Sequence, residues 1–228
     1  MKNLSPPRWV DRLIPGVTWR LPNTENQVFL TFDDGPVPGV TDWVLDRLAE
    51  RNIRATFFCL GRNAEAYPHL LARICEEGHA VGNHTYSHLA GFATTSRGYY
   101  ADVALANAIL HAQLFRPPYG RIWPQQLRMM RSRFRVVLWT VLSMDYSFRL
   151  SPWECSQIVE RRTRSGDIIV FHDSYRAERN LRYALPHALD CLLAAGFRFA
   201  PIVEPLFSVA PMALPTPLVL EPTPLRLD

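Results

Sequence analysis

The chain has 228 residues, with 25 Lys and Arg against 21 Asp and Glu, and a formal net charge of +4. Apolar residues make up 48% of it and charged residues 20%, a globular composition that excludes a disordered or fibrous chain. The weak positive charge comes with no concentrated basic arm, so the composition gives no indication of nucleic-acid binding.

Seven short apolar runs predict β-strands. They are rich in Val, Ile and Phe, and several are almost continuously apolar, which is typical of strands covered on both faces. The runs are Gln27–Phe32, Ala55–Leu60, His79–Gly82, Gln113–Phe115, Phe134–Leu142, Asp167–Phe171 and Phe197–Ile202.

Three stretches between these runs have the apolar spacing of helices, at Val40–Arg51, Asn63–Glu77 and Leu181–Ala195. The second and third each end just before a glycine, the residue most common after a helix C-terminus. Pro68 and Pro186 lie inside these two stretches. Because proline disrupts a helix interior, we expect regular helix to begin only at each proline.

The clearest helix start is Ser151–Glu154, where Ser at the N-cap, Pro at the first helical position and Glu at the third form a capping box. We expect this helix to run to Gly166. Strands that alternate with helices indicate βαβ units and a mainly parallel sheet.

Polar and ionisable groups directly follow five of the predicted strands. In parallel α/β folds function collects at the carboxyl ends of the strands, and five separate ends converge on one site most easily if the sheet is closed. We therefore predict an α/β fold, a distorted, incomplete (β/α)7 barrel related to the TIM barrel. An open Rossmann-like sheet is disfavoured because its glycine fingerprint is missing. The five segments are Thr31–Pro36, Asn83–His88, Arg116–Gly120, Ser143–Tyr146 and His172–Asp173.

Two tails fall outside this pattern. Residues 1–25 hold four prolines and predict an irregular N-terminal segment. Residues 204–228 hold six prolines and predict an extended, proline-rich tail. One domain of regular structure is therefore expected over residues 26–203.

His84 and His88 are four residues apart, which places two imidazoles on one face of a helical turn, where they can share one divalent ion. Two nearby histidines are by themselves a weak signal. Thr85 stands where a zincin has glutamate, so a metalloprotease of that class is disfavoured. A carboxylate from elsewhere would complete the site and leave a position open to water and substrate.

Asp33 and Asp34 can provide that carboxylate. Adjacent side chains point in different directions, so one aspartate can bind the ion while the other faces the attacking water. The alternative is a solvated Asp-Gly-Pro turn. Two acids directly after an apolar strand, together with the histidine pair, favour a site.

Two further segments carry candidate residues. Arg116 and Tyr119 flank two prolines that hold the backbone rigid, and a rigid surface turn is the alternative there. Asp145 and His172 each follow an apolar run. As a pair they would give a histidine of set tautomer and raised pKa, suited to donating a proton.

In this order the segments resemble the polysaccharide deacetylases with a NodB-like domain, carbohydrate esterase family 4. The resemblance covers roughly residues 26–200, nearly all of the regular structure. The matching motifs are TFDDGP at 31–36, HTYSH at 84–88 (H-[ST]-x-x-H), RPPY at 116–119 (R-x-P-Y) and IIVFHD at 168–173. The family's D-x-x-D-W motif is altered, because LSMDY at 142–146 keeps only Asp145 and has Tyr146 in place of Trp. That change bears on the aromatic wall of the substrate groove, and so on substrate preference.

The resemblance implies a metal-dependent hydrolase that removes N-acetyl groups from amino sugars of chitin-like or peptidoglycan-like glycans. It implies that Asp34, His84 and His88 hold one divalent metal, Zn²⁺ first, with Co²⁺, Ni²⁺ or Mn²⁺ as alternatives.

The resemblance also implies the remaining roles. Asp33 is the general base, held in place by Arg116. The backbone N–H of Tyr119 stabilises the oxyanion. His172, oriented by Asp145, protonates the leaving amine.

Two alternatives stay open. One is a deacetylase of the same fold that acts on a small intracellular acyl-amine, and the other is a non-catalytic glycan-binding domain. The presence of ligands, base, arginine and acid together weighs against a decayed site. A nucleic-acid-binding module has no motif to support it.

Targeting signals and cysteines give little further indication of function. No signal peptide is visible, and no apolar run approaches the roughly 18–20 residues that span a membrane, so a cytoplasmic location is the default expectation. The four cysteines form no C-x-x-C pair and are expected as free, buried thiols. The sequence predicts no oligomeric state.

Overall fold

The computed structural model of the chain describes residues 15–21 and 25–203. The proline-rich tail expected at 204–228 and most of the segment expected at 1–25 lie outside the described residues.

Nine strands form one curled sheet in which every paired neighbour is parallel. The sheet runs in the order β1-β6-β5-β4-β3-β2-β8-β7, and β9 pairs with the beginning of β2. The strands are β1 (Val17–Thr18), β2 (Gln27–Asp33), β3 (Thr56–Cys59), β4 (Ala80–Asn83), β5 (Leu114–Phe115), β6 (Arg135–Val137), β7 (Val141–Leu142), β8 (Ile168–His172) and β9 (Arg198–Phe199).

The sheet closes on itself almost completely, because one stretch of chain contributes to both of its sides. The run expected as a single strand at Phe134–Leu142 divides into β6, which pairs with β5, and β7, which pairs with β8 at the far end. Across the three-residue link, the Leu138 N–H donates to Thr18 and the Thr140 N–H to Ile168. The fold is therefore the expected incomplete barrel. The short strand β1 was not predicted.

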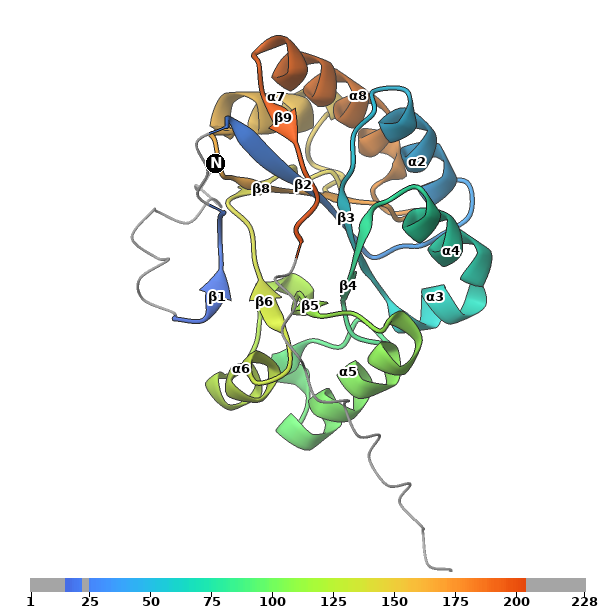
Figure 1. The fold of residues 1–228 in the computed structure, drawn as a ribbon, viewed down its shortest axis with the longest axis vertical. Helices are drawn as coiled ribbons and strands as arrows, with labels where there is room; N and C mark the ends of the chain where they lie inside the picture. The colour runs from blue at the N-terminus through green and yellow to red at the C-terminus, as the bar shows by residue number, and fades with distance from the viewer. Residues whose placement is uncertain (1–14, 22–24, 204–228) are drawn as a thin grey trace, which may run out of the picture.

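Helices lie on the outside of the curled sheet, except beside β1 at its edge (Figure 1). The α-helices are α2 (Thr41–Ala49), α3 (Gly61–Ala66), α4 (Pro68–Glu76), α5 (Ser96–Leu110), α6 (Pro124–Arg131), α7 (Pro152–Arg162) and α8 (Glu178–Ala194). No helix within residues 15–21 and 25–203 is both long and apolar enough to cross a membrane.

Two proline predictions have different outcomes. Pro68 begins α4, as expected, whereas Pro186 lies inside α8, which already begins at Glu178. The prediction at Pro186 was wrong because burial of one whole face of α8, from Leu181 to Leu192, stabilises the helix across the interruption. The capping box at Ser151 is present, but α7 ends at Arg162, short of the expected Gly166.

Side chains alternate along β2 and so divide the structure into two layers. Val28, Leu30 and Phe32 face the helices, where Phe32 stacks on Phe57 with ring centroids 4.9 Å apart. Between them, the side chains of Phe29, Thr31 and Asp33 face the barrel interior. Phe29 belongs to an apolar floor inside the barrel, together with Phe58, Leu114, Val137, Ile168 and Ile202. The polar residues of β2 therefore lie above an apolar floor, at the carboxyl ends of the strands.

Candidate active site

The two adjacent aspartates point to different partners because the backbone changes conformation between them. Asp33 is the last residue of β2, and its buried side chain faces the barrel interior. Asp34 has a left-handed backbone with φ +80, which aspartate adopts more readily than most residues. Its carboxylate consequently turns away from Asp33 towards the loop after β4.

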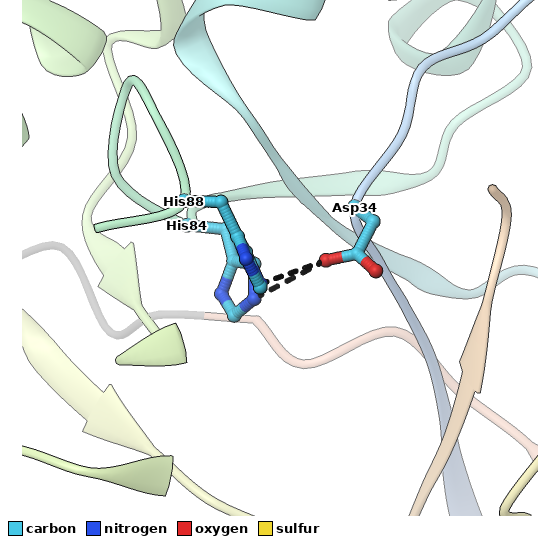
Figure 2. A group of neighbouring side chains, drawn as sticks. All are labelled: Asp34, His84 and His88. Atoms are coloured by element: carbon cyan, nitrogen blue, oxygen red, sulfur yellow. Dashed lines mark ion pairs between the residues drawn. The ribbon is translucent and has the colours of Figure 1, made fainter. Parts of the chain in front are cut away.

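Asp34 meets both predicted histidines (Figure 2). Its Oδ1 lies 3.1 Å from Nε2 of His88 and 3.7 Å from Nε2 of His84. Oδ1 is buried and accepts no well-aligned hydrogen bond from residues 15–21 and 25–203. One carboxylate and two imidazoles whose ligand atoms converge form a donor set that fits a first-row divalent ion.

The tautomer of His84 is set by the backbone. Its Nδ1–H donates to the carbonyl of Arg116 at 2.7 Å, since a carbonyl can only accept. The lone pair on Nε2 is therefore directed at Asp34. Burial lowers the pKa of His84, which keeps the imidazole neutral and ready to act as a ligand.

Neighbouring histidines also keep the carboxylate of Asp34 ionised. Burial opposes its ionisation, but contact with His88 and the nearby His172 and His84 outweigh burial and hold the pKa of Asp34 well below its usual range. Asp34 is accordingly an anion across the neutral range.

The helical turn expected for His84 and His88 is not present. Thr85 and His88 both have left-handed backbones, with φ +68 and +63, so the segment is an irregular loop. Asp102 of α5 holds this loop from outside: its Oδ1 accepts the N–H groups of Tyr86 and Ser87 at 2.8 and 3.1 Å. The histidines converge through loop conformation and not through helical spacing.

Arg116 is the largest fully buried side chain within residues 15–21 and 25–203. Its Nη1 donates to Asp33 Oδ1 at 2.6 Å and to Thr31 Oγ1 at 2.8 Å. Nε and Nη2 donate to the carbonyls of Val137 and Leu138, at the link between β6 and β7. Every partner is a buried acceptor. The guanidinium therefore connects β2 to the link between β6 and β7, which we call the seam of the barrel.

This arrangement leaves one oxygen of Asp33 for chemistry. Arg116 holds Oδ1, whereas Oδ2 lies 4.0 Å from Nε2 of His84 and so faces the candidate metal site. Asp33 and Asp34 thus have the two different orientations that the sequence predicts for a base and a ligand.

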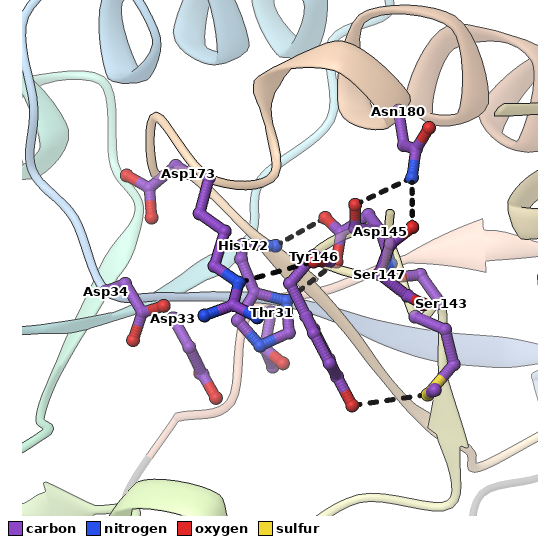
Figure 3. Close-up of polar contacts among 12 residues, drawn as sticks. Thr31, Asp33, Asp34, Ser143, Asp145, Tyr146, Ser147, His172, Asp173 and Asn180 are labelled. Carbon is purple, nitrogen blue, oxygen red and sulfur yellow. Dashed lines mark hydrogen bonds and ion pairs between the residues drawn. The ribbon is translucent and has the colours of Figure 1, made fainter. Parts of the chain in front are cut away.

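Asp145 and His172 are paired as predicted (Figure 3). Nδ1 of His172 lies 2.7 Å from Asp145 Oδ1, and the His172 backbone N–H donates to Oδ2 of the same carboxylate at 2.8 Å. Burial lowers the pKa of His172, but the charge and hydrogen bond of Asp145 outweigh burial and raise the pKa to about 9. His172 is therefore protonated at neutral pH, and no hydrogen bond of its Nε2 is found among the described residues.

Asn180 of α8 fixes the loop that carries Asp145. Its Nδ2 donates to the carbonyls of Asp145 and Ser147 at 2.9 and 3.0 Å. Tyr146, which stands in place of the family's Trp, lies edge-on to His172 with ring centroids 5.0 Å apart. The altered motif thus still places an aromatic ring against the histidine.

Tyr119 presents its backbone towards the same place. It lies in a short 3-10 turn, Pro118–Gly120, with a left-handed backbone at φ +60. Its N–H donates to no group of residues 15–21 and 25–203, and its ring packs edge-on to His88 with centroids 4.7 Å apart. The N–H is therefore available next to a candidate metal ligand.

Asp173 is a positioning residue that sequence reasoning did not assign. It is 1% exposed and accepts the Gly35 N–H at 3.1 Å and the Thr41 hydroxyl at 2.7 Å. Burial raises its pKa to about 8. A Cβ at Gly35 would overlap this carboxyl, which explains why glycine follows Asp34. The only sequence signal for Asp173 was its place directly after His172.

Comparisons with known proteins agree with this geometry. The family model described as polysaccharide deacetylase matches residues 20–133. A peptidoglycan-N-acetylglucosamine deacetylase of Bacillus cereus is 34% identical over 202 residues, which cover 82% of this chain and 92% of that protein. The chain spans 54% of a second Bacillus cereus relative with the same description.

Two further similarities cover nearly whole molecules. A chitooligosaccharide deacetylase of Azorhizobium caulinodans is 28% identical over 207 residues, covering 82% of this chain and 98% of that one. The crystal structure of a peptidoglycan N-acetylglucosamine deacetylase in complex with an N-hydroxybenzamide superposes with a TM-score of 0.76 at 31% identity, over 87% of this chain and 95% of the other.

We predict that Arg116→Met lowers the free energy of unfolding by about 3–5 kcal/mol, because it leaves the buried carboxylate of Asp33 without its partner. The double variant D33N/R116M should recover part of this loss, since it removes the unpaired charge. Urea unfolding measures both. Arg121→Met, at an exposed arginine five residues on, is the control and should change stability by about 0.5 kcal/mol or less. Equal stability of R116M and R121M would contradict the account.

Proposed function

The chain belongs to the polysaccharide deacetylase family, and on that premise we propose that it is a metal-dependent hydrolase that removes N-acetyl groups from the amino sugars of a glycan. The observation that carries this proposal is that three groups suited to different chemical roles lie close together. An Asp-His-His donor set, a carboxylate with one free oxygen and a protonated histidine all lie at the same end of one barrel.

Asp34, His84 and His88 would hold the metal ion. Zn²⁺ is the first candidate because it favours few ligands with imidazole nitrogen among them, and Co²⁺, Ni²⁺ or Mn²⁺ also suit such a donor set. When bound, the ion would polarise the amide carbonyl as a Lewis acid and make water a better nucleophile at neutral pH.

Asp33 is proposed as the general base. Its Oδ2 faces the donor set, and Arg116 fixes the carboxylate by holding Oδ1. Oδ2 would take the proton from the attacking water while Arg116 keeps the carboxylate from rotating or binding the ion itself. The rigid pairing orients the base before substrate arrives.

His172 is proposed as the general acid. Asp145 accepts its Nδ1–H, so Nε2–H is the proton available to the leaving amine. The backbone N–H of Tyr119 would donate to the oxygen that becomes negatively charged when water adds to the carbonyl. These two groups act on opposite parts of the amide, one on nitrogen and one on oxygen.

Exposed aromatic rings support a glycan in preference to a small acyl-amine. Rings that are at least half exposed follow the carboxyl ends of four strands, and they would offer flat apolar faces to the rings of a sugar chain. They are Phe92 after β4, Tyr119 and Trp123 after β5, Phe148 after β7 and Tyr175 after β8.

Peptidoglycan and chitooligosaccharides, the substrates in the descriptions of the relatives, are the two glycans to test first. A non-catalytic glycan-binding domain is not favoured, because the residues proposed as ligands, base and acid are all present, and the proposed ligands and base lie close together. Residues 26–203 are proposed as the catalytic domain, with 1–25 and 204–228 as flanking segments. The cytoplasmic location expected from the sequence stays a prediction.

Acetate release tests the function directly. The chain should release acetate from peptidoglycan fragments or chitin oligomers, lose this activity after chelation and regain it when Zn²⁺ is returned. Small non-sugar acetylated amines are assayed alongside, and activity confined to them would overturn the proposed substrate class. No acetate release from peptidoglycan fragments, chitin oligomers or these amines would overturn the proposal that the chain is an enzyme.

Two substitutions separate the base from the ligands. Asp33→Asn should keep the metal but lower turnover by about 10²–10⁴-fold, since only proton transfer is removed. His84→Ala should release the metal, and elemental analysis of the purified variants measures this. His69→Ala, at an exposed histidine on α4, is the control and should keep both metal and activity. Retained turnover in D33N would exclude Asp33 as the base.

The pH profile tests the acid. Because His172 must be protonated, kcat/KM should fall as pH rises through the pKa of about 9, or somewhat lower if a bound cation opposes protonation. Asp145→Asn removes the charge that raises this pKa and leaves one acceptor oxygen for the two N–H groups of His172 that the carboxylate accepts. The fall of kcat/KM at alkaline pH, the alkaline limb of the profile, should therefore move to lower pH by about one unit or more. An unchanged limb in D145N would show that another group is the acid.

A further inference from the structure

A second group of metal-ligating side chains lies in the outer helical layer, outside the candidate active site. Glu160 of α7 and His187 and Cys191 of α8 each offer one ligand atom, and these atoms all lie within 4.8 Å of one another. His187 and Cys191 are four residues apart on α8, so both project from the same face of a continuous helix. The group therefore bridges two helices.

The spacing is close to that of a small tetrahedral ion. Cys191 Sγ lies 3.6 Å from Nδ1 of His187, and Nε2 of His187 lies 3.8 Å from Glu160 Oε1. Zinc bonds of about 2.0–2.3 Å to oxygen, nitrogen and sulfur give ligand-to-ligand separations of about 3.3–3.6 Å. Because an ion binds only one ring nitrogen, its binding requires the side chain of Cys191 or Glu160 to move towards the nitrogen that the ion uses.

Glu160 supplies an independent observation. Its Oε2 accepts from Gln157 Nε2 at 2.6 Å, whereas its Oε1 is buried and accepts no hydrogen bond from the part of the chain that the structure describes. A buried carboxylate oxygen without a partner is costly unless a cation or a donor satisfies it. This oxygen is the one that faces His187.

The imidazole of His187 is held in place from two sides. Trp153 stacks on it with ring centroids 5.1 Å apart and an angle of 24° between the planes, and Tyr183 packs edge-on with centroids 5.7 Å apart. Contacts of this kind fix ring orientation, as outer-shell partners do in metal sites. The side chain of His187 is still 32% exposed, so an ion and a water ligand can reach it.

The thiol of Cys191 is not set up as a nucleophile. Burial, with Glu160 and Asp190 adding to it, raises the pKa of Cys191, which disfavours a free thiolate. Binding of an ion would release the thiol proton and so provide the thiolate that soft or borderline metals prefer.

We propose that Glu160, His187 and Cys191 form a second divalent-cation site, of the Zn²⁺ class, that ties α7 to α8. Its role is structural: α7 follows the loop that carries Asp145, and α8 follows the short segment after β8, the strand that ends in His172. It is separate from the Asp34, His84 and His88 group and does not depend on the deacetylase activity.

Cobalt distinguishes the two sites, because only the proposed one contains sulfur. The metal-free full-length chain is titrated with Co²⁺, and a thiolate-to-cobalt charge-transfer band in the near ultraviolet is expected with a second bound equivalent. Cys191→Ser should abolish the band and lose that equivalent, while it keeps the other equivalent and the deacetylase activity.

Matched variants make the assignment specific. Cys59 and Cys155 are buried as expected, but Cys75 is exposed and Cys191 is partly so, which corrects the expectation that all four are buried. Cys75→Ser should leave the band and both equivalents intact. His187→Gln should behave as Cys191→Ser does, whereas His84→Ala should lose only the sulfur-free equivalent.

Alkylation of the unmodified chain avoids any effect of substitution on folding. Zn²⁺ should slow the reaction of iodoacetamide with Cys191 but not with Cys75, as peptide mass spectrometry would show. A wild-type chain with no charge-transfer band, or a band and stoichiometry unchanged in C191S and H187Q, would overturn the proposal. So would equal alkylation of Cys191 with and without Zn²⁺.

Discussion

A single buried cation, the guanidinium of Arg116, is the constraint on which the site depends. A full charge at 0% exposure must be surrounded by acceptors, and the barrel provides them from elements far apart in the sequence. The side chain donates to Asp33 and Thr31 of β2 and to two carbonyls at the seam between β6 and β7. Its own carbonyl accepts from His84, so one residue orients the proposed base, a proposed ligand and the closure of the sheet.

The loops above the apolar floor are held in conformations that the chain would rarely adopt alone. Asp34, Thr85, His88 and Tyr119 are all non-glycine residues with φ between +60 and +80. Left-handed backbone at such residues persists only where the surroundings determine it, and it collects at functional sites. The surroundings here are three side chains that accept from or donate to the loop backbone, Asp173 after β8, Asp102 on α5 and Asn180 on α8. The polar groups are thereby fixed before any ligand binds.

The sequence predicts which polar residues come together better than it predicts the backbone and contacts that hold them. Motifs directly after apolar strands placed Asp33, Asp34 and Arg116 correctly, because strand ends meet in a parallel barrel. The helical turn expected at His84 was wrong, since spacing alone cannot reveal the left-handed backbone of Thr85 and His88, or the contact of this loop with Asp102 on an unpredicted helix. That helix, α5, was missed because Gly98 near its start weakens the local helical pattern. Likewise, the division of one apolar run into β6 and β7 depends on closure of the sheet and has no local signal.

Anomalous diffraction at the metal absorption edge, from crystals of the Zn²⁺-loaded chain, tests the central claim most directly. The claim is that Arg116 keeps Asp33 out of the metal's ligand set while Asp34 binds the ion. The account predicts a peak within bonding distance of Asp34 Oδ1, His84 Nε2 and His88 Nε2, with Asp33 Oδ1 still paired to Arg116. A peak bonded to Asp33, or one remote from both histidines, would contradict it.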